Sequence, residues 1–415
     1  MQSQNPITKP REFTPDQKLV VWVLWLTYGS FYFCRNNLGV AVPGIMAEFG
    51  HSKMEMGAVL MGLKLAYGLG QVINGQLAER LSPTKLIATG MMASALLNVL
   101  FGWVEGLWFF IFVWAVNGYA QALGWTPCMK VASSWFDALH RGRAIGIIGT
   151  GYQLCGGLTY LVSGWAAESY GWRAALWIPA IILTLSSVHM LLFLKDAPES
   201  AREARAKGSA AALSLGTTVR MTLTTPALWV VAVTLCVLDA CRYGFSDWGV
   251  THLKEIQKVS VGSAALKYAV LPFGGIAGAL VSGWMTDRFF AGRRAPMVVI
   301  LMALLGCLTL AYDTVIHWGP LVSVSLLFAV GFCIFGSQVL LVGTLPVDLA
   351  RQGTAAAAAG FVNFMGYMGA AGGDWMTGTL AERHGWPVAV RFWACCAFAG
   401  AIFISFLWNK SNSTS

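Results

Sequence analysis

Residues 164–172 read GWAAESYGW, and residues 378–386 read GTLAERHGW. Both copies share the pattern G-x-x-A-E-x-x-G-W, and each follows a long apolar segment. A second pair of runs agrees with the first, because residues 75–80 (GQLAER) are similar to residues 283–288 (GWMTDR). Two motifs repeated in the same order indicate a duplicated unit rather than chance similarity between short glycine-rich turns.

The chain is too apolar for a soluble protein. Hydrophobic residues make up 56% of its 415 residues and charged residues only 11%, whereas soluble domains carry about 25% charged residues. A membrane-spanning helix needs about 20 mainly apolar residues. The segments that meet this requirement are residues 19–42, 57–77, 86–104, 107–131, 144–165, 174–194, 227–250, 264–285, 296–316, 320–342, 354–380 and 388–408. The sequence therefore predicts an all-α membrane protein with twelve transmembrane helices in two pseudo-symmetric six-helix bundles.

One long polar stretch divides the chain. We expect residues 1–194 to form the first bundle, residues 195–225 a cytoplasmic linker and residues 226–415 the second bundle. Most of the 28 lysines and arginines fall in the N-terminal segment, the linker and the loops on the same side. Basic loops remain in the cytoplasm, so both termini are expected there, with the chain embedded in the inner or plasma membrane.

Composition also excludes several classes of function. The net charge is +9, but the basic residues lie in short loops and form no continuous face, so we expect no nucleic-acid binding. The nine cysteines show no CxxC pair and no metal-ligand spacing with histidine, so we expect no metal site and no cofactor. No arrangement of nucleophile, acid and base indicates catalysis. We expect a monomer that is not an enzyme.

The repeated runs at 75–80 and 283–288 resemble the loop signature of the major facilitator superfamily. The residues that carry this gating-loop motif are Gly75, Arg80, Gly283, Asp287 and Arg288. Polar motifs within four apolar segments narrow the resemblance to the organophosphate:phosphate antiporter family. These motifs are Tyr28, Tyr32, Arg35, Asn36 and Asn37 in the first segment, Asn117, Gln121, Trp125, Pro127 and Cys128 in the fourth, Arg242, Tyr243, Gly244, Asp247 and Trp248 in the seventh, and Gly366, Tyr367 and Gly369 in the eleventh.

This resemblance implies exchange of a small phosphorylated organic anion for inorganic phosphate, with Arg35 and Arg242 gripping the phosphoryl group. An arginine at bilayer depth costs at least about 2.5 to 3.5 kcal/mol, so water, a partner or a ligand must compensate it. Arg35 shares one helical face with Tyr28 and Tyr32. A phosphoryl dianion can accept paired hydrogen bonds from two guanidinium groups that would otherwise repel each other.

Structural alternatives stay open for both arginines. Arg35 could pair with Asp374 on another helix, and Arg242 could pair with Asp239, which lies three residues earlier on the same helix. Either acid could instead carry a coupling proton, which leaves a proton-driven symporter of an organic anion as a second hypothesis. A membrane sensor that binds the same ligand is a third, because the resembled family includes receptors.

Further candidates for substrate binding share these faces. Lys64, Tyr67 and Gln71 have spacings of three and four residues on the second segment, although Lys64 could also extend to the outer surface. Trp125 could pack against the organic part of the substrate or be structural. The uncharged candidates for hydrogen bonding are Gln153, Asn363 and Tyr367.

Three positions depart from the resembled family. The aromatic-glycine pair of the tenth segment is Phe335 and Gly336, without a tyrosine hydroxyl. Gln71 stands where many members carry a lysine, and Gln153 stands where glycerol-phosphate members carry a histidine. The sequence therefore leaves open which organophosphate or phosphonate is bound.

Overall fold

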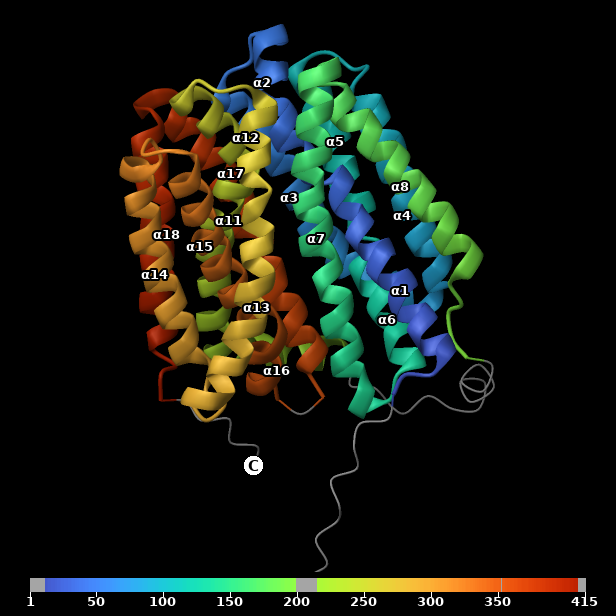
Figure 1. Ribbon diagram of the computed structural model, residues 1–415. Helices are drawn as coiled ribbons and strands as arrows, with labels where there is room; N and C mark the ends of the chain where they lie inside the picture. Colours follow the sequence, from blue (N-terminus) through green and yellow to red (C-terminus); the bar gives the residue numbers. More distant parts are fainter. Residues whose placement is uncertain (1–11, 199–214, 352, 410–415) are drawn as a thin grey trace, which may run out of the picture.

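The computed structural model describes residues 12–198, 215–351 and 353–409, and the regular structure within them is helical (Figure 1). The first half contains α1 (Pro15–Ser30), the 3-10 turn η1 (Phe31–Cys34), α2 (Asn37–Phe49), α3 (Lys53–Arg80), α4 (Pro83–Phe101), α5 (Leu107–Gln121), α6 (Trp125–Trp135), α7 (Ala138–Tyr170) and α8 (Ala174–Phe193).

The second half begins with a short helix that the sequence did not predict. This helix, α10 (Leu215–Leu223), lies within the stretch that we expected to be only a linker. The elements that follow it are α11 (Pro226–Gln257), α12 (Val261–Tyr268), α13 (Val270–Phe289), α14 (Arg294–Val315), α15 (Pro320–Val339), the π-helical turn η2 (Leu340–Thr344), α16 (Leu345–Leu349), α17 (Ala355–His384) and α18 (Trp386–Ser405).

Each of the twelve predicted apolar segments is mainly helical, and turns interrupt some of them, for example the first and the fourth. Among the described residues, nine helical segments are long and apolar enough to cross a membrane by length and hydropathy. The other three predicted spans coincide with α1 to α2, α3 and α17. Each of these three carries a buried charged side chain, namely Arg35, Lys64 or Asp374. These groups are buried in the interior rather than exposed to lipid.

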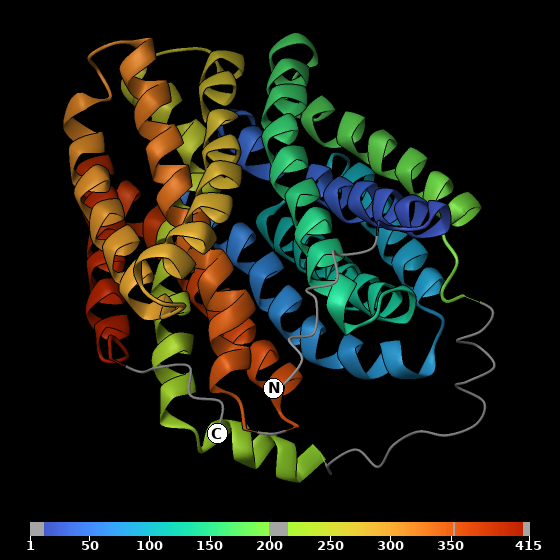
Figure 2. The same ribbon diagram turned by 60° about the horizontal axis from the view of Figure 1, so that its bottom comes forward.

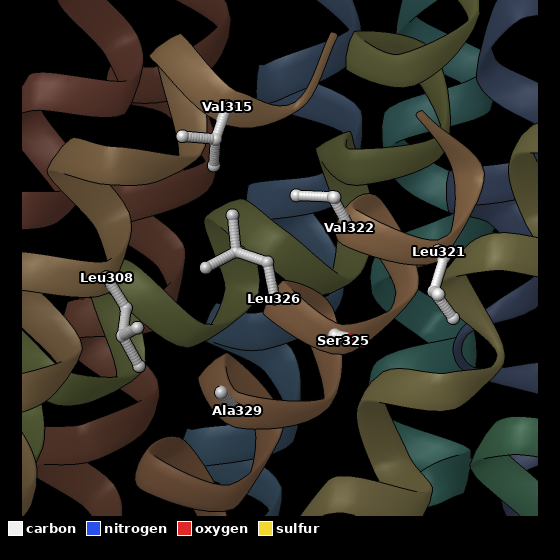
Figure 3. A pocket seen from close by; sticks show the side chains of 7 residues that line it. All are labelled: Leu308, Val315, Leu321, Val322, Ser325, Leu326 and Ala329. Carbon is white, nitrogen blue, oxygen red and sulfur yellow. The ribbon is translucent and has the colours of Figure 1, made fainter. Parts of the chain in front are cut away.

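The outer surface is apolar, as a lipid-facing surface requires. Large exposed side chains such as Leu96, Phe112 and Leu185 lie on α4, α5 and α8. A pocket on the outer side of α14 and α15 is equally apolar (Figure 3). Its lining residues are Leu308, Val315, Leu321, Val322, Ser325, Leu326 and Ala329. With a single hydroxyl among them, this pocket has no group that could bind an anion.

The two halves stand side by side and meet along several helix pairs (Figures 1 and 2). Helix α3 of the first half packs along α17 of the second, and α7 packs against α12 and α13. Helix α2 also contacts α11. The interior between the halves is thus lined by α1 to α3 and α7 from one side and by α11, α13 and α17 from the other.

The repeated G-x-x-A-E-x-x-G-W motif closes one end of this interface. In the first copy, a carboxylate oxygen of Glu168 on α7 accepts a hydrogen bond from the backbone N–H of Gly262 on α12 (3.1 Å). In the second copy, Glu382 on α17 accepts one from the N–H of Lys53 on α3 (2.9 Å). Each glutamate therefore binds the first turn of a helix in the opposite half, where free N–H groups are available.

The tryptophans of the motif make matching contacts at the same end. Trp172 donates to Glu48 at the end of α2 (2.8 Å), and Trp386 donates to Glu255 at the end of α11 (2.7 Å). Arg173 also binds Glu48, and this pairing holds the pKa of that carboxyl, which lies beyond the predicted span, at about 2. We refer to the end of the interface that carries these contacts as the seam. Its symmetric pattern is the physical counterpart of the sequence repeat.

Candidate substrate site

Arg35 lies where the first span is interrupted. Helix α1 ends in the 3-10 turn Phe31–Cys34, and α2 resumes at Asn37. The interruption leaves backbone carbonyls without helical partners, and buried amides of neighbouring helices bind them. The carbonyl oxygen of Cys34 accepts hydrogen bonds from Asn117 (3.0 Å) and Asn98 (3.3 Å). The polar residues of α4 and α5 thereby fix the turn that presents the arginine.

Gln121 orients the guanidinium of Arg35. Its side-chain oxygen accepts a hydrogen bond from Arg35 Nε (3.1 Å), and its amide nitrogen donates to the carbonyl of Phe31 (3.1 Å) and to the hydroxyl of Ser94 (2.7 Å). The rings of Tyr32 and Tyr67 lie 4.6 Å and 4.4 Å from the guanidinium carbon. These contacts hold the group without neutralising its charge.

Both terminal nitrogens of Arg35, Nη1 and Nη2, are buried and have no hydrogen-bond partner among the described residues. The residue is only 2% exposed. A guanidinium has five N–H donors in a fixed plane, and leaving such donors unpaired in a buried position is costly. The arrangement therefore calls for an acceptor that the protein itself does not supply. The alternative pairing of Arg35 with Asp374 is not present.

Arg242 on α11 is buried in a similar environment. Its Nη1 lies 3.4 Å from Asp239, so the ion pair expected from their spacing forms, although it is long. Its Nε is buried without a partner among the described residues. The rings of Tyr243 and Phe335 lie 4.7 Å and 5.0 Å from the guanidinium carbon. Asp239 thus occupies one donor of Arg242 and leaves Nε available.

Tyr32 connects the two arginines. Its ring packs against Arg35 and also lines a small buried pocket that contains Arg242. The residues that line this pocket are Tyr32, Asn36, Tyr152, Gln153, Gly156, Tyr160, Arg242, Tyr243, Ser246, Pro272 and Phe335. They come from both halves. The pocket combines one strong cation, two amides and several aromatic rings, which suits an anionic head group with a compact organic part.

An aromatic wall continues from this pocket into the first half. Tyr32 stacks on Tyr152 at 5.1 Å between ring centroids, and Tyr28 lies against Trp125 at 4.6 Å. Tyr28 also makes an edge contact with Tyr32 at 6.0 Å. The structure therefore brings together Tyr28, Tyr32 and Trp125, three of the residues that the sequence suggested for substrate binding.

Tyr67 and Tyr367 meet across the interface, with ring centroids 4.3 Å apart. Gln71 accepts a hydrogen bond from Thr126 (3.1 Å), and its amide nitrogen is buried without a partner among the described residues. Asn363 is half-buried on α17, and the pocket around Arg242 does not include it.

Lys64 is engaged in an ion cluster. It is 1% exposed, so it does not extend to the outer surface. Its ammonium forms an ion pair with Asp247 on α11 and lies 3.3 Å from a carboxylate oxygen of Asp374 on α17. It also lies 4.4 Å from the centre of the Tyr243 ring. One cation of the first half thus holds two acids of the second half.

The gating-loop motif forms the ends of helices rather than a loop. Gly75 and Arg80 belong to the last turns of α3, and the side chain of Arg80 lies outside the described part. Gly283, Asp287 and Arg288 belong to the end of α13, where the two charged side chains are exposed. Helix α13 extends further than predicted because Asp287 and Arg288 at its end lie where water satisfies them.

Several residues of the site were not among the candidates. Tyr152, Tyr243 and Asn36 line the pocket, Gln121 positions Arg35, and Asp247 binds Lys64. Four of these residues belong to the polar motifs of the sequence, namely Asn36, Gln121, Tyr243 and Asp247. Sequence spacing did not show which side chains they would contact. The sequence signal for Gln121 was an amide side chain within the predicted apolar segment 107–131.

Comparison with known proteins identifies the family. Residues 24–373 match the Major Facilitator Superfamily. The chain is 30% identical over 408 residues to a glycerol-3-phosphate transporter of Bacillus subtilis, covering 94% of this chain and 91% of that protein. The chain belongs to the organophosphate:phosphate antiporter family of this superfamily. This antiporter-family chain is also 27% identical to a probable hexose phosphate transport protein of Chlamydia muridarum (95% and 91% coverage). It is equally similar, at 27%, to the membrane sensor protein UhpC of Escherichia coli (88% and 86% coverage).

Solved structures share the fold of this family member. A bacterial homolog of the human lysosomal transporter Spinster superposes with a TM-score of 0.74 at 15% identity, covering 95% of this chain and 96% of that one. The nucleoside transporter NupG superposes with a TM-score of 0.73 at 15% identity, covering 96% and 100%. The chain thus has the major facilitator fold.

Proposed function

We propose that the protein exchanges a small organophosphate or phosphonate anion for inorganic phosphate, through alternating access at the pocket between its halves. The observation that carries this proposal is the presence of two buried arginines with unpaired donor nitrogens, one in each half. A phosphoryl group offers three oxygens and up to two negative charges, so it can accept from both guanidinium groups at once. The names of the relatives, which include glycerol-3-phosphate and hexose phosphate transport proteins, support the same substrate class.

The geometry also accounts for exchange. With the site empty, Arg242 in the pocket and Arg35 against the other face of the site at Tyr32 carry like charges from opposite halves, and closing the halves brings these charges together. A bound dianion replaces this repulsion by attraction, so the loaded carrier reorients more readily than the empty one. Either substrate, organophosphate or phosphate, supplies the necessary phosphoryl group. The protein moves its substrate without chemical change and acts as a monomer in this scheme.

The aromatic wall selects the remainder of the substrate. Tyr28, Trp125 and Tyr152 offer apolar faces next to the charged site, and Gln153 and Asn36 offer hydrogen bonds. Such a site favours a small organic part with few hydroxyl groups over a large sugar, because each buried hydroxyl needs a partner. We therefore place small phosphate esters and phosphonates ahead of hexose phosphates.

Exchange is tested in proteoliposomes loaded with labelled inorganic phosphate. External phosphate esters or phosphonates are expected to release the label without an imposed proton gradient, and small substrates are expected to do so at lower concentrations than hexose phosphates. Uptake that depends on a proton gradient and ignores internal phosphate would replace this proposal by the symporter hypothesis. Saturable binding without any exchange would indicate a sensor.

The orientation proposed from the basic loops places the seam outside the cell and both termini in the cytoplasm. The linker position Ser209 lies outside the described residues, and a cysteine placed there is expected to react only with a reagent supplied from the cytoplasmic side. Labelling of intact cells by an impermeant reagent would reverse the orientation.

A further inference from the structure

The cluster of Lys64, Asp247 and Asp374 has an unbalanced charge. One ammonium faces two carboxylates, and the three side chains are 1%, 2% and 0% exposed. With every group ionised, the cluster carries a net charge of −1 in a site without access to water. A buried uncompensated charge is strongly disfavoured, and a titratable group in such a place changes its protonation state instead.

Asp374 is the member of the cluster without a well-formed hydrogen bond. Among the described residues, neither of its carboxylate oxygens has a partner in hydrogen-bond geometry, and one of them lies 3.3 Å from the Lys64 ammonium. Asp247, by contrast, accepts a direct hydrogen bond from Lys64. Two carboxylates that share one site do not both remain ionised, because their charges repel at short range. A proton on one of the two carboxyls removes this repulsion.

Lys64 is the cation that the neighbouring helices place against this carboxyl. Helix α3 presents Lys64, and α11 presents Asp247 and Tyr243. On α7, the hydroxyl of Tyr160 donates to a backbone carbonyl of α11. On α18, Trp393 donates to a threonine of α17. Among the described residues, Asp374 forms its ion pair with Lys64, and no group of three or more His, Cys, Asp or Glu side chains is arranged to hold a metal ion.

We propose that the closed seam binds one proton on the Asp247–Asp374 pair, so that closing the seam takes up a proton and opening it releases one to the same side. Lys64 belongs to α3, whereas both acids belong to the opposite half. When the halves separate at this end, water reaches the two carboxylates, and both can ionise. When the halves close, the ammonium neutralises one carboxylate, and the proton neutralises the other.

A lower pH on the side of the membrane that the seam faces therefore favours the closed form. Because one proton is bound in the closed state and absent in the open state, the ratio of closed to open molecules changes by up to about tenfold per pH unit. The proton returns to the side from which it came, so exchange needs no proton gradient. The seam acid Glu48 does not compete in this range, because its pKa is lowered to about 2 by hydrogen bonds from Arg173 and Trp172.

Distance measurements between spin labels test the proposal. The labels are placed at Glu105 and His317, which are exposed on equivalent loops of the two halves near the seam. The exposed Cys307 and Cys395 are replaced by serine to provide a background. The full chain in nanodiscs is examined by pulsed electron paramagnetic resonance from pH 5.5 to 8.5. The fraction with the short distance is expected to fall as the pH rises.

Removing either acid is expected to abolish this dependence. Asp374→Asn leaves the balanced Lys64–Asp247 pair, and Asp247→Asn leaves a balanced pair with Asp374, so both variants should keep one closed fraction across the range. Asp247→Asn serves as the second test should the first variant fail to fold. The matched control is Glu382→Gln. It removes an acid that contacts the opposite half at the seam but lies outside the Lys64 cluster, so this variant is expected to retain the full dependence on pH.

This inference rests on the part of the proposed function in which the halves separate at the seam, and not on the identity of the substrate. Distances that respond to added inorganic phosphate but not to pH would refute the proton site while leaving the proposed exchange intact. A wild-type pH dependence that persists in both asparagine variants would also refute it. A single short distance under all conditions, with and without phosphate, would contradict alternating access itself.

Discussion

Substitution of Arg35 or Arg242 by lysine is expected to abolish most substrate binding although the positive charge is kept. Lysine supplies a compact ammonium, whereas each arginine supplies a planar set of donors that matches two phosphoryl oxygens. Loss of one partner of a buried, charge-assisted contact costs about 2 to 5 kcal/mol. This corresponds to a loss of affinity of roughly 30-fold to several thousand-fold. Binding to the purified variants is measured by isothermal titration calorimetry.

The loss should be the same for every phosphorylated substrate, including inorganic phosphate, because the arginines contact only the head group that these substrates share. Thermal stability of each variant serves as the control, since Arg242 also pairs with Asp239. A folding defect in Arg242→Lys with normal affinity in the folded fraction would show that this arginine is structural. An Arg35→Lys protein that binds and exchanges like the wild type would remove Arg35 from the site.

Substitution of Lys64 by methionine is expected to destabilise the protein by about 3 to 5 kcal/mol, the usual effect of removing one partner from a buried ion pair. The cation that forms ion pairs with both buried acids in the described part of the chain would then be missing. The triple variant Lys64→Met, Asp247→Asn, Asp374→Asn removes all three charges while keeping similar volumes, and it should recover most of the lost stability. Thermal unfolding in detergent measures both effects.

The same pair of variants separates two roles for Lys64. If the lysine binds substrate directly, Lys64→Met should lower affinity without loss of stability, and the triple variant should not restore binding. If it closes the seam, the triple variant should fold and bind phosphate nearly as well as the wild type. A Lys64→Met protein as stable as the wild type would contradict the structural role of the cluster.

The sequence identified the fold and the arginine positions because each leaves a strong local signal. Membrane spans are recognisable from apolar length, and Arg35 and Arg242 stand out as cations at bilayer depth. The i, i+3 spacing of Asp239 and Arg242 correctly indicated their contact. These features depend on residues close together in the chain, so that sequence spacing describes them well.

The partners of Lys64 could not be predicted in this way. Asp247 and Asp374 were both visible as acids within apolar helices, but their pairing with Lys64 depends on how α3 packs against α11 and α17 in the other half. The interruption of the first span at Cys34 was equally hidden, because amides on α4 and α5 compensate it. Contacts between helices distant in sequence leave no periodic pattern.

The central claim is that one phosphoryl group binds both arginines, and a structure of the protein with a bound phosphonate tests it most directly. Phosphoryl oxygens are expected within hydrogen-bond distance, about 2.7 to 2.9 Å, of Nη1 or Nη2 of Arg35 and of Nε of Arg242. The organic part is expected against Tyr28, Trp125 and Tyr152. A phosphonate bound elsewhere, with both guanidinium groups still unpaired, would contradict the account.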